Sequence, residues 1–174
     1  DGAELAAGEF TDETEIALCI METYTSTNGE LDPELIRARM QFLAQGESRR
    51  WMNPETLRSL DDDAEPWYCA SNHDDPEVAL RGIPIGLIHA APVIDQAALY
   101  RDVETVVSLT HCSRAAIEQA FLVAMVVART LSGASVPGSL LDDLCPVLAD
   151  PQLATAVDQA RTAMAASSDL STFM

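Results

Sequence analysis

Lysine is absent from this sequence, and aromatic residues and cysteines are few. All 10 basic residues are arginines, against 28 acidic residues, and the formal net charge at pH 7 is −18. A charge this negative repels nucleic acids and anionic membranes, so we expect neither as a partner. Two explanations for the missing lysine stay open. One is a GC-rich genome that encodes arginine instead, and the other is a halophilic protein whose dense carboxylate surface stays hydrated in salt.

Aromatic residues make up only 5% of the chain, whereas hydrophobic residues make up 48%. The core must therefore be aliphatic and rich in alanine, which favours packed helices over a β-sandwich. A chain of 174 residues has the length of one ordinary domain. We therefore predict an all-α fold, with residues 1–174 forming a single helical bundle domain.

The four cysteines lie far apart and form neither a Cys-x-x-Cys motif nor a Cys/His metal-binding spacing. Cys19 and Cys112 adjoin apolar runs of helical type, so we interpret both as small buried hydrophobic residues. We accordingly expect reduced thiols and a cytoplasmic protein. The longest apolar run, residues 121–128, is much shorter than the about 20 residues that a membrane span requires.

An aspartate or asparagine precedes proline at Asp32, Asn53, Asp75 and Asp150. Such a side chain can cap the first N–H groups of a helix, and proline in the next position lacks an N–H that would be unpaired there anyway. We therefore predict a helix start at each position. The acidic segment 61–77 is expected to be a solvated loop, because its spacing lacks the alternating ligands and central glycine of a calcium-binding EF-hand.

Apolar patterning indicates which helices are buried. The first helix is expected over residues 12–24, buried on most sides, and the last starts at Asp150-Pro151. An amphipathic helix is predicted over 96–109, and residues 113–131 are apolar almost all round, as expected for a buried central helix. In the second helix we expect these side chains to face inward: Leu35, Ile36, Met40, Phe42 and Leu43.

Glycine and proline interrupt the apolar stretch 78–91 at Gly82, Pro84 and Gly86. In a buried position, such an interruption indicates a bent element or a close approach of two backbones.

Oxygen-bearing side chains crowd the start of the first helix, at Thr11, Asp12, Glu13 and Thr14. One interpretation is structural, since threonine can cap a helix and acidic residues in the first turn complement the helix dipole. The other is a metal site, because carboxylate and hydroxyl oxygens suit Mg²⁺. These residues alone do not complete a site, so further carboxylates must come from elsewhere.

Residues 11–18 (Thr-Asp-Glu-Thr-Glu-Ile-Ala-Leu) resemble the Thr-Asp-Asp-Thr-Glu-Met-Ala-Leu signature of the ADP-ribosylglycohydrolase family, which includes crystallin-like relatives. Further segments are similar to family motifs in the same order. These are the helix start at 31–35, the segment 53–60, and Leu-Thr-His at 109–111 before the long helix. Between them, Arg81, Pro84, Gly86 and Leu87 match part of the family's Asn-Gly-Ala-Leu-Met-Arg-x-x-Pro-x-Gly motif.

The resemblance implies an all-α fold that binds two Mg²⁺ ions, which position and activate a water for attack on the anomeric carbon of ADP-ribose. The substrates would be ADP-ribosylated proteins or small ADP-ribose conjugates. Thr11, Asp12 and Glu13 match the family's first metal-ligand cluster, and His111 matches a position that contacts substrate. Without the family context, His111 would be interpreted as a helix-terminal histidine bonded to backbone carbonyls.

The chain departs from the family pattern in several places. Glu13 replaces the usual aspartate, and Pro76-Glu77 replaces Asn-Gly in the substrate loop. The family's upstream Gly-Asp-Ala-Leu-Gly segment and its C-terminal Asp-x-Asp-Thr cluster are missing, so we expect an incomplete domain that is inactive by itself. Two alternatives remain open: a degenerate, non-catalytic relative with a binding or structural role, and an unrelated acidic helical domain with a chance motif.

Overall fold

The computed structural model describes residues 5–61, 76–133, 141 and 148–166, and these residues form helices and no β-strand. The α-helices are α1 (Asp12–Ser26), α2 (Pro33–Gln45), α3 (Pro54–Ser59), α4 (Gly82–Ile88), α5 (Gln96–Val107), α6 (Arg114–Leu131) and α8 (Pro151–Ala166). Two 3-10 helices, η1 (Glu47–Arg50) and η2 (Pro76–Arg81), precede α3 and α4. The prediction of an all-α fold is confirmed. The loop expected at 61–77 falls mostly on residues 62–75, outside the described residues.

The predicted caps are present wherever the structure describes them. Asp32 accepts hydrogen bonds from two backbone N–H groups of α2, at 3.0 and 3.1 Å. Asn53 accepts one at the start of α3, at 2.8 Å, and Asp150 accepts two at the start of α8, at 3.0 and 2.8 Å. Asp75 lies outside the described residues, but a helix, η2, begins directly after it. The local rule of capping residue and proline therefore sets the start of α2, α3 and α8.

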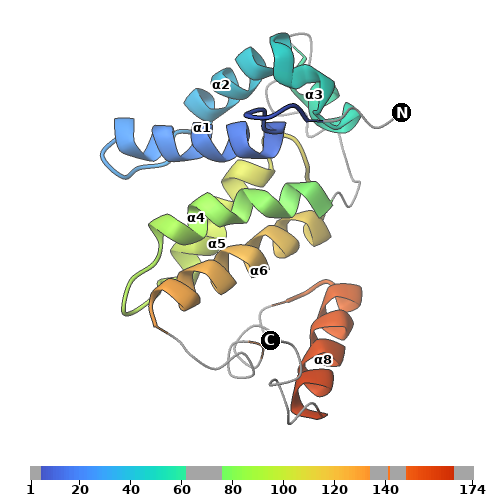
Figure 1. Ribbon diagram of the computed structural model, residues 1–174. Coiled ribbons are helices and arrows are strands. Elements are labelled where there is room, and N and C mark those ends of the chain that lie inside the picture. The colour runs from blue at the N-terminus through green and yellow to red at the C-terminus, as the bar shows by residue number, and fades with distance from the viewer. Residues whose placement is uncertain (1–4, 62–75, 134–140, 142–147, 167–174) are drawn as a thin grey trace.

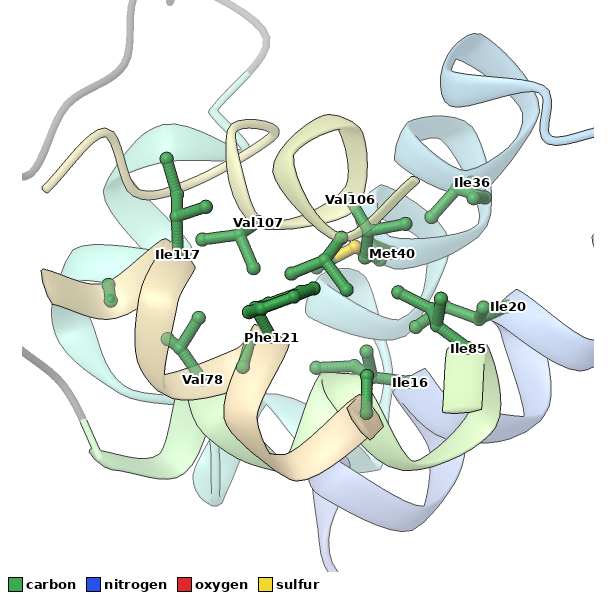
Figure 2. Packing of buried hydrophobic residues seen from close by; sticks show 14 of the residues in the cluster. Ile16, Ile20, Ile36, Met40, Val78, Ile85, Val106, Val107, Ile117 and Phe121 are labelled. Atoms are coloured by element: carbon green, nitrogen blue, oxygen red, sulfur yellow. The ribbon is translucent and has the colours of Figure 1, made fainter. Parts of the chain in front are cut away.

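Helix α6 is the central helix that the sequence predicted. It packs against α4, α5 and η2, and one face of it is buried along its whole length. Its Phe121 is 1% exposed, and the ring packs edge-on against Tyr100, with centroids 5.2 Å apart. Figure 2 shows Phe121 among aliphatic side chains from the other helices, including Ile16 of α1 and Val106 of α5. The core is thus mainly aliphatic, and Phe121 is its most deeply buried aromatic ring, followed by Tyr24.

Helices α4 and α6 approach each other closely enough to exclude a side chain. A Cβ atom at Gly82 would lie 2.1 Å from the carbonyl oxygen of Ala120, and one at Gly86 would lie 2.4 Å from that of Ala124. The close backbone approach predicted from the glycines is therefore confirmed. Pro84 does not break the helix, because it is the third residue of α4, where no intrahelical partner awaits an N–H.

Three predictions about side-chain placement were wrong. Phe42 is 76% exposed, because it lies two residues, or about 200°, from the buried Met40 around α2. Leu18 is 52% exposed, so α1 is buried on one side and not on most sides. Cys112 is exposed and disulfide-bonded, whereas Cys19 is the buried free thiol that we expected.

None of the described helices is both long and apolar enough to cross a membrane.

Two polar clusters join helices that are distant in sequence. Asp102 of α5 accepts hydrogen bonds from the Tyr24 hydroxyl of α1, at 2.9 Å, and from His89 Nε2 at the end of α4, at 2.8 Å. The fully buried Glu118 of α6 accepts the backbone N–H groups of Ala149, at 3.0 and 3.1 Å, and Asp150, at 2.9 Å. Glu118 thereby holds the start of α8, which lies on the far side of α6 from α1 and α2 (Figure 1).

Candidate functional site

The start of α1 carries the predicted metal-binding residues. Thr11 is the N-cap residue, with an extended backbone, but its side chain makes no capping hydrogen bond. Its hydroxyl donates instead to the Glu13 carboxylate. Thr11 is therefore the N-cap residue through its backbone conformation only, and its side chain restrains the Glu13 carboxylate.

Asp12, the first residue of α1, is buried with an unsatisfied oxygen. The residue is 5% exposed, and its Oδ1 atom has no hydrogen-bond partner among the described residues. Burial, together with the negative charges of Glu13 and Glu77, raises the pKa of Asp12 from 3.8 to about 6. A buried carboxylate oxygen without a donor is unusual in folded proteins and indicates a group kept for a ligand or a proton.

A small pocket opens beside Asp12, with a cavity of about 20 Å³. This volume holds about one water molecule or one ion. The pocket lies between α1, α3 and η2, which the packing of α1 on η2 brings together. Its polar lining residues are Asp12, Glu13, Asn53, Thr56, Glu77 and Arg81.

Behind the pocket, Arg81 is buried and donates hydrogen bonds in two directions. Its guanidinium contacts the hydroxyl of Thr110, in the segment between α5 and α6, and the hydroxyl of Thr56 on α3, at 3.4 Å. The Thr110 hydroxyl lies 2.9 Å from Nδ1 of His111. Ser59 of α3 donates to the Thr110 carbonyl at 2.9 Å. This polar network fixes α3, η2 and the segment before α6 relative to one another.

The structure places Thr11, Asp12 and Glu13 at one helix start; Asp12 and Glu13 line the pocket, whereas Thr11 does not line it and contacts Glu13. His111 is fully buried and does not line the pocket, and it connects to the pocket through Thr110 and Arg81. Its predicted contact with substrate stays a prediction.

The sequence did not predict a pocket role for Thr56. It placed Glu77 both at the end of the acidic segment 61–77 and, through the family resemblance, in the substrate loop; Glu77 is exposed and lines the pocket. Thr56 is buried on a short capped helix. The available signal was the position of each residue within a segment similar to a family motif, since no local pattern brings α3 beside α1.

The pocket offers the hard oxygen donors that Mg²⁺ prefers, from carboxylates, a hydroxyl and an amide. The orphaned Oδ1 of Asp12 fits such an ion, which would supply the positive charge that the carboxylate lacks. Within the part of the chain that the structure describes, however, no three His, Cys, Asp or Glu side chains gather closely enough to bind a metal. The described residues therefore do not form a complete metal site by themselves.

Comparison with known proteins agrees with the resemblance seen in the motifs. The chain is similar to the uncharacterized protein YegU of Escherichia coli (strain K12), with 27% identity over 133 residues. That match covers 73% of this chain and 39% of the relative, so the chain spans well under half of the relative's length. No solved structure shows a significant match to the chain. A model of the ADP-ribosylglycohydrolase family matches residues 2–173. The chain therefore belongs to the ADP-ribosylglycohydrolase family.

Proposed function

We propose that the pocket beside Asp12 is part of the active site of a Mg²⁺-dependent hydrolase that removes ADP-ribose from modified proteins or small ADP-ribose conjugates. Membership of the family supports hydrolysis of a glycosidic bond in general terms. The observation that carries the proposal for this chain is the buried, partnerless Oδ1 of Asp12 beside a cavity of ionic size. The raised pKa of Asp12 supports it as well, because burial first, and then the negative charges of Glu13 and Glu77, disfavour the ionised carboxylate.

In this proposal Thr11, Asp12 and Glu13 hold the metal, and the family's second ion requires carboxylates beyond the described residues. When bound, Mg²⁺ supplies a positive charge that orients and acidifies a water. Asp12 contributes a carboxylate whose position is fixed by the first turn of a buried helix. Thr11 restrains Glu13 through its hydroxyl, which offsets part of the extra freedom of the longer side chain.

The cavity accommodates an ion and not a nucleotide, so ADP-ribose would lie at its open side. Glu77 is exposed there and adds negative charge where phosphates would approach. The buried Arg81 supplies the nearest positive charge among the pocket-lining residues, and its hydrogen bonds to Thr56 and Thr110 hold it in place. We therefore expect Arg81 to offset part of the repulsion between the acidic residues and a phosphate.

One observation favours the alternative of a non-catalytic relative with a binding role. Glu13 is longer than the aspartate of the family motif, and the Thr11 hydroxyl already occupies its carboxylate. Since Mg²⁺ requires nearly ideal octahedral geometry, a displaced carboxylate weakens metal binding more than it disturbs the fold.

A Mg²⁺-dependent thermal shift distinguishes these functions. It is to be measured on the protein encoded by the uninterrupted reading frame around this segment, with Asp12→Ala as the test variant. We expect Mg²⁺ to raise the melting temperature of the wild type through linkage and to leave Asp12→Ala unchanged. Asp158→Ala, which removes an exposed aspartate of α8, is the matched control and should respond as the wild type does.

Release of ADP-ribose from an ADP-ribosylated peptide is the second readout. If the wild type releases ADP-ribose and responds to Mg²⁺, and Asp12→Ala does neither, the hydrolase function is supported. A Mg²⁺ response without turnover supports the binding role. If the wild type shows no response to Mg²⁺, the metal-dependent proposal is wrong.

A further inference from the structure

His111 can carry its proton on either ring nitrogen, and the hydrogen bond at one nitrogen decides the state of the other. In this structure Nδ1 of His111 lies 2.9 Å from the hydroxyl oxygen of Thr110. Either group can be the donor in such a contact. Which of them donates follows from the other contacts of Thr110.

Thr110 is fully buried, so its hydroxyl hydrogen needs a partner within the protein. Among the described residues, the hydroxyl contacts the guanidinium of Arg81 and Nδ1 of His111. A guanidinium has donors and no acceptor. Arg81 therefore occupies a lone pair of the Thr110 oxygen, and the hydroxyl hydrogen has Nδ1 of His111 as its acceptor.

We propose that Arg81 and Thr110 are positioning residues that hold His111 in the tautomer with the proton on Nε2. Nδ1 accepts from Thr110, and the neutral ring keeps one proton, which resides on the other nitrogen. The positive charge of Arg81 strengthens this arrangement, because it polarises the hydroxyl that donates to Nδ1. His111 is thereby a neutral hydrogen-bond donor through Nε2.

The arrangement connects the pocket to His111. Arg81 lines the pocket beside Asp12, and the same guanidinium contacts Thr110. Ser59 donates to the Thr110 carbonyl and restrains the backbone at this point. Resting on the proposed function, the same contacts hold Arg81 at the pocket, on the side where a phosphate of ADP-ribose would approach, so that Thr110 positions both the buried His111 ring and the guanidinium of Arg81.

Nitrogen-15 NMR of the imidazole rings tests the proposal on the protein encoded by the uninterrupted reading frame around this segment. Spectra are recorded at about pH 8, where histidine side chains are ordinarily neutral, and His111→Gln identifies the His111 signals by their loss. We expect Nε2 of His111 to give the signal of a protonated nitrogen and Nδ1 that of an unprotonated one. If Nδ1 carries the proton in the wild type, the proposal is overturned, and no variant is needed for that result.

Variants then test the two positioning residues. Thr110→Val removes the hydroxyl at nearly constant volume, so we expect the Nδ1-protonated form to appear, whereas Thr110→Ser should keep the wild-type spectrum. Arg81→Met should also release the tautomer, because the Thr110 oxygen can then accept from Nδ1. Thr105→Val is the matched control, since its exposed hydroxyl donates to the Arg101 carbonyl. A Thr110→Val spectrum identical to that of the wild type would overturn the role of Thr110.

Titration with ADP-ribose, in the protein of the uninterrupted reading frame, separates this inference from the proposed function. If Thr110→Val binds ADP-ribose about 10-fold more weakly than the wild type, and Thr110→Ser binds it as the wild type does, both the positioning role and the proposed function are supported. If ADP-ribose does not bind to any form while the tautomer responds as described, the proposed function fails and the positioning role stands. If ADP-ribose binds but the His111 tautomer is the same in the wild type and in Thr110→Val, only the positioning role is wrong.

Discussion

Asp12 and Asp102 are both largely buried aspartates, and their surroundings are opposite. Asp102 accepts hydrogen bonds from Tyr24 and His89, which join three helices through one carboxylate. Burial alone would raise its pKa, but these hydrogen bonds outweigh burial and hold the pKa of Asp102 below its usual value. Asp12 has one oxygen, Oδ1, without a partner in the described part of the chain, and burial is the first cause that raises its pKa to about 6.

The difference separates a structural carboxylate from a candidate functional one. A buried charge that is fully hydrogen-bonded stabilises the fold, whereas one that is left unsatisfied lowers stability and is retained where a ligand completes it. Helix α1 is involved in both places. Asp12 is its first residue, and Tyr24, near its other end, donates a hydrogen bond to Asp102. One helix thus contributes to a structural cluster and to the pocket.

The largest effect is expected on removing the structural carboxylate. Asp102→Ala leaves the buried Tyr24 hydroxyl and His89 Nε2 without an acceptor and should lower the free energy of unfolding by about 4 kcal/mol, measured by urea denaturation. The control is Asp158→Ala, which removes an exposed pair with Arg161 and should cost less than about 0.5 kcal/mol. Equal losses in the two variants would refute the distinction.

Removing the charge of Asp12 is expected to raise the free energy of unfolding, in contrast to the change at Asp102, when the protein is freed of metal with EDTA. The difference between a pKa of about 6 and the usual 3.8 corresponds to about 3 kcal/mol of destabilisation of the ionised form. Asp12→Asn removes the charge but keeps a buried polar group, so we expect a gain of about 2 kcal/mol at pH 8. A loss of stability at that pH would show that Asp12 is satisfied in solution.

The pH profile sharpens the comparison, because the two aspartates act in opposite directions. The native state holds the Asp12 proton up to about pH 6, whereas the unfolded state releases it near pH 3.8. The stability that Asp12 contributes therefore falls as the pH rises from about 4 to 6, and the advantage of Asp12→Asn grows over that window. The contribution of Asp102 is present above the unfolded-state pKa and is lost as acid protonates the native carboxylate. Denaturation curves of the wild type and both variants across this range measure the two slopes.

The smallest effect on stability is expected at Glu13. Glu13→Asp restores the family's residue and shortens a half-buried side chain, so the free energy of unfolding should change by less than about 0.5 kcal/mol. The Mg²⁺-dependent thermal shift should nevertheless increase, because the shorter carboxylate suits octahedral geometry better. An unchanged shift would mean that Glu13 does not bind the metal.

Much of the fold could be predicted because its signals are local. Asp32, Asn53 and Asp150 cap their helices with their own side chains, within three residues of their position. The glycines of α4 likewise indicated a close approach before the partner helix was known. The burial predicted for Phe42 was wrong, because hydrophobicity alone does not give the side of α2 on which a residue lies.

The site divides in the same way. The sequence by itself determined an acidic, all-helical, alanine-rich domain and placed Thr11, Asp12 and Glu13 on one helix start, because adjacent residues stay adjacent in any fold. Only the tertiary structure decided that Oδ1 of Asp12 has no hydrogen-bond partner among the described residues, that Thr56 and Glu77 share its pocket, and that Arg81 reaches Thr110. Burial and hydrogen bonding depend on segments distant in sequence, and no local pattern encodes which of two aspartates receives a partner.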